Sequence, residues 1–180
     1  MNQHSNPESG EEGMLPVNGG VDAARFRQAM ARFAASVNIV TTDGPAGPRG
    51  VTATSVCSVS DDPPIILVCL NAQGPLNERF VENEVFALNV LGAEQEPVAR
   101  AFAGEGRLST EERFATARWT RLGSGAPILE GALASFDCRL RERTKVATHN
   151  VLFGEVIGVR TGGDDASLLY LGRRYRSLGS

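Results

Sequence analysis

The sequence predicts a mainly β protein with a few peripheral helices, and three observations lead to this prediction. Strand-like segments follow one another in runs, without the regular strand and helix alternation that a doubly wound sheet requires. The chain from residue 132 onward contains strand-like segments only. No GxGxxG motif joins a strand to a helix, so a dinucleotide-binding α/β fold is not indicated.

The composition is that of an ordinary globular domain. The chain has 180 residues, of which 42% are apolar and 22% charged, and its net charge is -3. Its basic residues are spread along the chain, which argues against nucleic-acid binding, and no apolar run is long enough to span a bilayer. Three cysteines outside any CxxC motif and the lack of a signal peptide predict a cytoplasmic protein without disulfides or a zinc site.

The N-terminal part is divided into a tail and a first helix. Residues 1–20 are polar and lack periodicity, which predicts a flexible tail ahead of one domain over residues 21–180. The first helix is expected to begin after Asp22 as N-cap and to end near Ser36, before a strand in SVNIVTT. Helical spacing predicts one buried face along this region, formed by Phe26, Met30, Phe33 and Val37.

A single alternating strand is expected over residues 50–60, GVTATSVCSVS. Alternation would place its residues on two faces. One face would carry Val51, Ala53, Ser55, Cys57 and Val59, and the other Thr52, Thr54, Val56, Ser58 and Ser60.

The middle of the chain mixes short strands and helices. The apolar run 64–70 predicts a buried strand after the DDPP turn, and residues 86–91 predict another. Helices are expected over 75–83 and 94–103. The polar segment 104–125 is expected to be irregular, with Phe114 and Trp119 as packing anchors.

The C-terminal part is predicted to be all strand. Residues 132–141 alternate between apolar and polar side chains, which predicts a half-buried strand with a charged outer face. This strand would pair with residues 149–160 through a loop near 144–148. A last short strand is expected over residues 168–172.

Two features could carry chemistry. A row of hydroxyl side chains along residues 52–60 suits a phosphate or the edge of a flavin ring, although Ser and Thr also commonly face water in strands. His149, the only histidine after the tail, could contact a nicotinamide or could be a surface residue. No GxSxG elbow and no Cys/His cluster accompanies them.

Several stretches taken together resemble one family, the flavin reductases that supply reduced flavin to two-component monooxygenases such as phenol and 4-hydroxyphenylacetate hydroxylases. These stretches cover about residues 22–178 in the same order. They are FRQAMARFAASVNIVTT, GVTATSVCSVSDDPPIILVCL, FALNVL with AFAG, HNVLFGEV and LLYLGRRYRSL. The resemblance implies a split β-barrel of the FMN-binding type with Greek-key connections, and a homodimer with flavin near its interface.

The resemblance also implies a set of site residues. His149 corresponds to the family's histidine near the nicotinamide, and Tyr175 to a C-terminal tyrosine near the same site. The flavin would lie against the following residues: Asn38, Thr52, Ala53, Thr54, Ser55, Ser58, Val59, Ser60, Ala87 and Asn89.

The implied function is an NADH-dependent flavin reductase that passes reduced flavin to a transient monooxygenase partner. FAD is favoured over FMN from the phenol-hydroxylase-type resemblance, and NADH over NADPH because the sequence shows no arginine pocket for a 2′-phosphate. Three alternatives remain. These are a flavin-binding module without reductase activity, an enzyme like pyridoxamine-phosphate oxidase, for which no cluster of phosphate-binding basic residues is visible, and a purely structural barrel.

Overall fold

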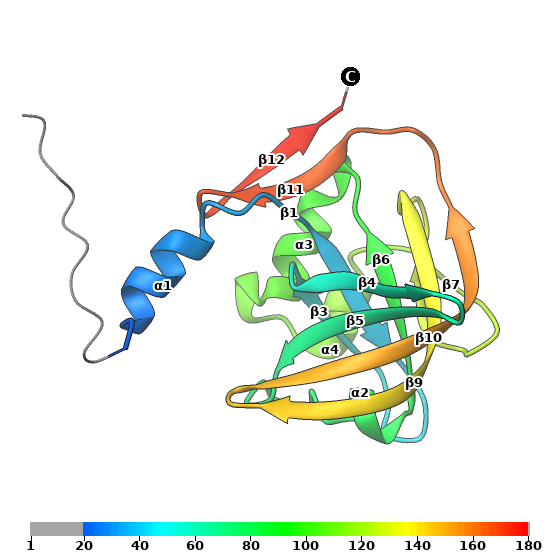
Figure 1. The fold of residues 1–180 in the computed structure, drawn as a ribbon. Helices are drawn as coiled ribbons and strands as arrows, with labels where there is room; N and C mark the ends of the chain where they lie inside the picture. The colour runs from blue at the N-terminus through cyan, green and yellow to red at the C-terminus, as the bar shows by residue number, and fades with distance from the viewer. Residues whose placement is uncertain (1–19, 180) are drawn as a thin grey trace, which may run out of the picture.

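A seven-stranded antiparallel sheet forms the body of the protein, as a computed structural model covering residues 20–179 shows. The strand order is β3-β2-β6-β9-β10-β5-β4. The strands are β2 (Asn38–Thr42), β3 (Arg49–Ala53), β4 (Val56–Asp61), β5 (Pro64–Asn71), β6 (Val85–Val90), β9 (Ala134–Val146) and β10 (His149–Thr161). The mainly β prediction is therefore confirmed (Figure 1).

The sheet is forced to curl by its own connectivity. β3 and β4 lie at opposite edges of the sheet, yet only Thr54 and Ser55 separate them in sequence. Six interstrand spacings of about 4.8 Å would put the edges of a flat sheet about 29 Å apart. Consecutive Cα atoms are about 3.8 Å apart, so the link from Ala53 to Val56 spans at most about 11 Å. The two edges therefore approach each other without pairing as a ladder.

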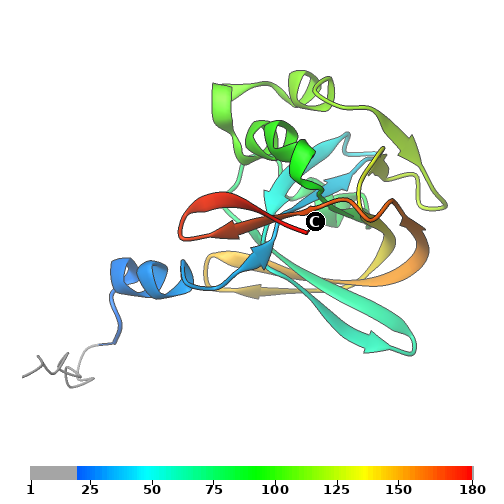
Figure 2. The ribbon, with the colours of Figure 1, turned by 90° about the horizontal axis from the view of Figure 1, so that it is seen from above.

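Two smaller sheets and the helices cover this body. β1 (Ala35–Ser36), β11 (Ser167–Leu171) and β12 (Arg174–Leu178) form one sheet, and β7 (Trp119–Arg121) pairs with β8 (Pro127–Leu129). The α-helices are α1 (Ala23–Met30), α2 (Arg79–Glu82), α3 (Glu96–Ala103) and α4 (Thr110–Phe114). Short 3₁₀ turns, η1 (Ala93–Gln95) and η2 (Glu105–Arg107), flank α3. Figure 2 shows α3 and α4 on the same side of the sheet, with α1 projecting away from the body.

Two apolar cores occupy the two faces of β2. Val40 packs with Phe86, Leu152 and their neighbours inside the curled sheet. Ile39 faces a second core beneath α3, which contains Leu91 and Phe102. Because both faces are covered, the whole of β2 is buried. The segment 104–125 is not irregular as expected, because it contains α4 and β7. Its expected aromatic anchors are confirmed, since Phe114 and Trp119 pack edge-on against Phe102 with ring centroids 5.2 and 5.6 Å away.

The single strand expected over residues 50–60 is wrong. The chain breaks at Thr54 and Ser55 into β3 and β4, and a register shift between Ser58 and Ser60 disturbs the alternation further. The cause is the connectivity of the sheet, because a continuous strand could not reach both edges. The two sets of alternating side chains predicted for residues 50–60 therefore do not form two faces of one strand.

The first helix is shorter than expected and does not bury its apolar face. Asp22 is its N-cap as predicted, accepting bonds from the backbone N–H groups of Ala24 at 2.8 Å and Arg25 at 3.0 Å. Phe26 is 57% exposed and Met30 43% exposed. Val37 is buried, but it lies beyond the helix between β1 and β2. The predicted tail, residues 1–20, falls outside the described residues except for Gly20.

Three other differences come from tertiary packing. The helix expected over 75–83 is confined to α2, after a series of turns, and β12 was missed. The predicted charged outer face of residues 132–141 is wrong at its centre, because Asp137 is fully buried. The loop that contains Ser124 covers this carboxylate. Ser124 donates to Asp137 through its backbone N–H, at 2.8 Å, and through its hydroxyl. No helix among residues 20–179 is long and apolar enough to cross a membrane.

We predict that Gly154→Ala destabilises the fold. A Cβ atom at Gly154 would lie 2.3 Å from Cζ of Phe86 and 3.0 Å from Cβ of Cys138, both in the core. Overpacking of this kind costs about 1–3 kcal/mol, and we expect that loss in the free energy of unfolding measured with urea. Gly163→Ala is the matched control, because its Cβ would meet nothing closer than 3.5 Å. Equal stability of the two variants would contradict the packing described for β10.

Candidate functional site

A cleft of about 450 Å³ opens where the end of β3 faces the end of β5 and the start of β10. Its walls include Thr54, Ser55 and His149, together with Arg49 and Arg113, and we call it the Arg49 cleft. Its volume lies within the range of about 300–1,000 Å³ typical of small-molecule sites. No Asp or Glu lines it among the described residues, so its charged lining is entirely basic.

The link between β3 and β4 presents free backbone donors at this cleft. The N–H groups of Thr54 and Ser55 have no hydrogen-bond partner among residues 20–179, because neither residue belongs to a strand ladder. The carbonyl of Ser55 accepts from the N–H of Cys69 at 2.9 Å, which fixes the link to β5. Unpaired N–H groups held in this way can donate to a carbonyl or an anionic oxygen of a ligand.

Another wall of the cleft is formed by the end of α3. Thr52 donates its hydroxyl to the carbonyl of Ala99 at 2.6 Å, which ties β3 to α3. The helix ends at Gly104, whose φ of 101° is in the left-handed region that glycine adopts without strain. Ala103 and Gly104 both line the cleft, so this wall has little side-chain bulk and a flat ligand can approach the backbone.

Arg49 is the most enclosed charged group of the cleft, with 8% of its surface exposed. Its Nε donates to Oδ1 of Asn77 at 3.0 Å. Burial lowers the pKa of Arg49 from its ordinary value, and the neighbouring cations Arg113 and Arg79 lower it further. The residue remains a cation at neutral pH, because a guanidinium does not deprotonate in proteins.

His149 begins β10 and lies at the mouth of the cleft. Its ring is exposed, and Nδ1 lies 2.9 Å from Oγ1 of Thr148. No carboxylate is paired with it among the described residues. The imidazole is therefore placed to contact a ligand and has none of the partners of a catalytic triad.

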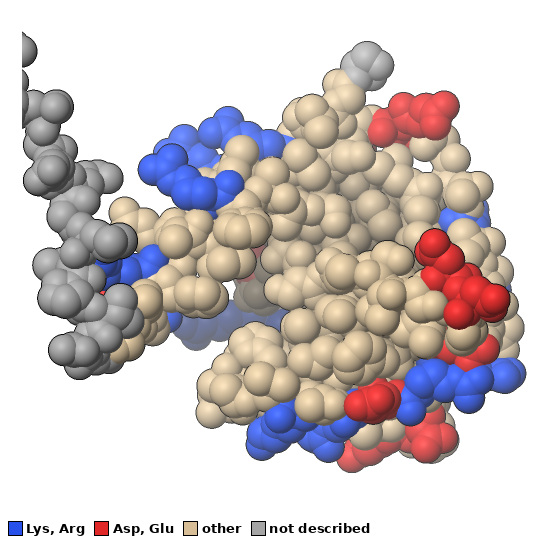
Figure 3. Space-filling view, in the orientation of Figure 1, with Lys and Arg blue, Asp and Glu red and all other residues tan. Residues whose placement is uncertain are grey.

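A second cleft, of about 610 Å³, adjoins the first one and is called here the Tyr175 cleft. Thr52, Thr54 and Ala103 line both. Arg100 lies over the ring of Tyr175, 4.8 Å from its centroid, and is paired with Glu96 and Glu105. Figure 3 shows basic residues gathered at the tip of the β11–β12 hairpin, which contributes Arg173 and Arg174 to this cleft.

The structure thus brings part of the predicted site together and separates the rest. Residues 52–55 and His149 meet in the Arg49 cleft, while Tyr175 lies in the neighbouring one. Ser58, Val59 and Ser60 lie on β4 and line neither cleft, because the chain breaks at Ser55.

Asn38, Ala87 and Asn89 are fully buried and line neither cleft. The side-chain amide of Asn89 is hydrogen-bonded within the protein. It donates to the carbonyl of Ile39 and accepts from the backbone N–H of Leu129 and the hydroxyl of Ser135. Asn38 donates to the carbonyl of Ala53 at 3.3 Å and so reaches the cleft only through β3. These side chains hold the strands that carry the site.

Sequence reasoning missed the basic residues of the cleft. It found no cluster of phosphate-binding basic residues, yet Arg49 and Arg113 line the same cavity. They are far apart in the chain, on β3 and α4, and only the packing of α3 and α4 against the sheet joins them. The one local signal was Arg49 itself, a charged residue at the start of a strand that is otherwise apolar or hydroxylated.

Comparison with known proteins identifies the family of the domain. A family model described as a flavin reductase like domain matches residues 30–179. A protein of Variovorax paradoxus named FMN reductase (NADH) RutF is 48% identical over 155 residues, covering 86% of this chain and 85% of the relative.

Solved structures of flavin reductases are also similar. The flavin reductase component of a bacterial two-component tryptophan halogenase has a TM-score of 0.81 and 32% identity, covering 88% of this chain and 99% of its own. An NADH:FAD oxidoreductase of Streptomyces globisporus, in complex with NAD and FAD fragments, has a TM-score of 0.79 and 34% identity, covering 88% and 93%. The matched family model and these similarities show that the chain belongs to the flavin reductase family.

Proposed function

We propose that this protein is an NADH-dependent flavin reductase whose flavin binds in the Arg49 cleft. The observation that carries the proposal is the wall formed by residues 52–55. Within residues 20–179 its backbone donors have no partner, and no acidic side chain lines the cavity. The names of the relatives, an FMN reductase that uses NADH and an NADH:FAD oxidoreductase, support it.

The residues present fit a flavin. Its ring edge carries carbonyl and nitrogen acceptors, which the N–H groups of Thr54 and Ser55 can meet. Ala53, Ala103 and Gly104 leave room for a flat ring against the backbone. The hydride transfer itself is chemistry that the two bound cofactors supply.

The role of the protein is therefore orientation and electrostatics. The donors at residues 54 and 55 would stabilise the negative charge that develops on a reduced flavin, in a cleft whose charged lining is basic. His149 would hold the nicotinamide at the mouth of the cleft, and Tyr175 would contact the dinucleotide from the adjoining one. This role needs no carboxylate to position a proton donor, and no carboxylate of the described residues lines the Arg49 cleft.

The flavin is proposed to be a substrate that leaves after reduction. The cleft is open to solvent and adjoins a second open cleft, which suits exchange of a ligand. Its receiver would be a flavin-dependent monooxygenase component that captures reduced flavin transiently. The two-component halogenase reductase supports such a partnership. The preference for FAD over FMN and the cytoplasmic location stay predictions from the sequence.

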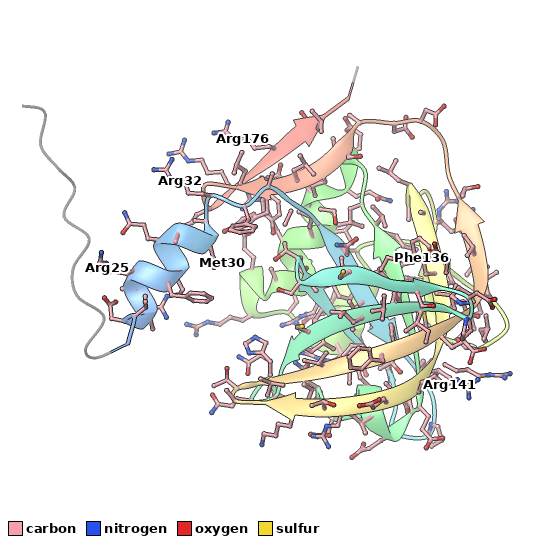
Figure 4. The ribbon with its side chains drawn as sticks, in the orientation of Figure 1. Arg25, Met30, Arg32, Phe136, Arg141 and Arg176 are labelled. Carbon is pink, nitrogen blue, oxygen red and sulfur yellow. The ribbon has the colours of Figure 1, made fainter. Side chains whose placement is uncertain are left out.

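A homodimer is proposed to complete the assembly. Phe26 on α1 and Phe33 just after it are 57% and 66% exposed, so these apolar side chains are not covered by the described chain. Figure 4 shows Met30 on the same helix, apart from the sheet body. A second copy of the chain is the occupant that would bury these side chains.

The first prediction here concerns activity. Under anaerobic conditions we expect NADH to be consumed only when free flavin is added, one NADH per flavin reduced. The measurement follows absorbance at the nicotinamide and flavin bands, with FAD and FMN compared at equal concentration. Binding of flavin without any reduction would contradict the proposal and would identify a binding module instead.

The second prediction concerns His149. Because the ring is exposed and has no acidic partner, His149→Ala should raise the KM for NADH about tenfold, the loss expected when one hydrogen bond of about 1.4 kcal/mol is removed. The KM for flavin should stay unchanged, which serves as the internal control. If turnover fell while the KM for NADH stayed the same, a positioning role for His149 would be wrong.

The third prediction concerns assembly. Phe33→Asp should convert a dimer to a monomer, because a charge in a buried apolar interface is left unpaired. Light scattering after gel filtration measures the mass. Gln28→Asp, a change on α1 outside the apolar set, should remain a dimer. A wild-type protein with the mass of one chain would refute the dimer.

A further inference from the structure

Two arginines, Arg49 and Arg113, line the Arg49 cleft, and Arg79 lies near Arg49 outside its lining. Arg49, Arg79 and Arg113 form no salt bridge with any Asp or Glu among residues 20–179. Other arginines of the chain do form such pairs. Examples are Arg100 with Glu96 and Glu105, and Arg121 with Asp43. The most buried cation of the cleft is thus one without a counter-ion.

The guanidinium groups of Arg49 and Arg113 are each held through Nε. Arg49 donates Nε to Oδ1 of Asn77 at 3.0 Å, and Arg113 donates Nε to the carbonyl of Leu108, also at 3.0 Å. The terminal nitrogens of both have no partner among the described residues, and they are not among the side-chain atoms sealed from solvent. Each guanidinium is therefore held through one bond, with its two terminal nitrogens free.

Asn77 in turn is fixed by its own surroundings. Its Nδ2 donates to the carbonyl of Asn71 at 2.9 Å. A side chain at Gly74 would collide with it, because a Cβ atom there would lie 2.4 Å from Nδ2. The turn after β5 thus places an amide oxygen where it orients Arg49. The position of this cation in the cleft is set by the fold.

Enclosing a cation without a counter-ion is unfavourable unless an anion compensates it. The cations Arg113 and Arg79 increase the cost, because they repel Arg49 and lower its pKa. Forked guanidinium groups bind phosphate through two parallel hydrogen bonds, which suits a doubly charged phosphate ester. The cleft therefore has the features of a phosphate site.

We propose that Arg49 and Arg113 bind the 5′-phosphate of the flavin nucleotide, and so select phosphorylated flavin over riboflavin. This assignment rests on the proposed function, because it places the flavin in the Arg49 cleft. Asn77 is a positioning residue that acts through Arg49. Arg79 donates Nη1 to the carbonyl of Pro48 at 2.9 Å. Its contribution to the site is therefore the positive charge that it adds near Arg49.

A nucleotide phosphate could also come from NADH, and the arrangement of the two clefts favours the flavin. Arg49 and Arg113 share their cavity with the free donors of residues 54 and 55, which fit a flavin ring. The Tyr175 cleft has its own exposed cations, Arg173 and Arg174, near two tyrosine rings. The flavin nucleotide and NADH thus each have a basic region of their own, in the Arg49 cleft and the Tyr175 cleft respectively.

The test compares FMN with riboflavin, which differ only in the phosphate. Dissociation constants come from quenching of flavin fluorescence without NADH, and kcat/KM from NADH oxidation at saturating NADH. For Arg49→Gln we expect affinity for FMN to fall about 10- to 100-fold, the loss of a charge-assisted hydrogen bond, while affinity for riboflavin stays the same. Arg113→Gln should give the same selective loss, and it is the second variant in case Arg49→Gln fails to fold.

Arg118→Gln is the matched control, because it removes an arginine whose side chain is 89% exposed and lines neither cleft. Its affinity for both flavins should equal that of the wild type. Equal losses for FMN and riboflavin, or a rise in the KM for NADH alone, would overturn the assignment. If wild-type protein binds FMN more tightly than riboflavin but reduces neither, the reductase function fails while the phosphate subsite stands.

Discussion

The two-residue link between β3 and β4 is the constraint on which the rest of the structure depends. It joins strands at opposite edges of a seven-stranded sheet, so the sheet has to curl until those edges approach each other. The curl encloses the core around Phe86. It also removes Thr54 and Ser55 from any ladder, so their N–H groups, at the wall of the cleft, have no partner within residues 20–179. The same covalent link therefore closes the fold and creates the donors of the site.

Polar groups are used differently inside the body and at the cleft. Within the body, buried polar side chains such as Asn89 and Asp137 are bound to strands and loops of the chain itself. At the cleft, the backbone donors of the link and the terminal nitrogens of Arg49 have no partner among the described residues. Because these donors are not used by the described part of the chain, they are available to donate to a ligand in the cleft.

The electrostatics of the cleft also fit redox chemistry between two cofactors. The chain carries a net charge of -3, yet the charged side chains lining the Arg49 cleft are all basic. A basic cavity favours both a phosphate and the negative charge of a reduced flavin. His149 is exposed and is paired with no carboxylate among residues 20–179, which agrees with the role in orienting a ligand proposed above. The basic lining of the cleft therefore agrees with the flavin reductase family that the sequence resembles and the comparisons show.

The sequence by itself determined the mainly β class, most strand positions and the flavin reductase resemblance, because these depend on local periodicity and on short ordered motifs. The resemblance named residues 52–55 and His149 as site residues, and these line one cavity in the structure, although residues 50–60 were treated as one strand. Only the tertiary structure decided that β3 and β4 separate to opposite edges, and that Ala87 and Asn89 lie in the interior. It also decided that Arg49 and Arg113 meet, because contacts between residues far apart in sequence follow from packing and leave no periodic signal along the chain.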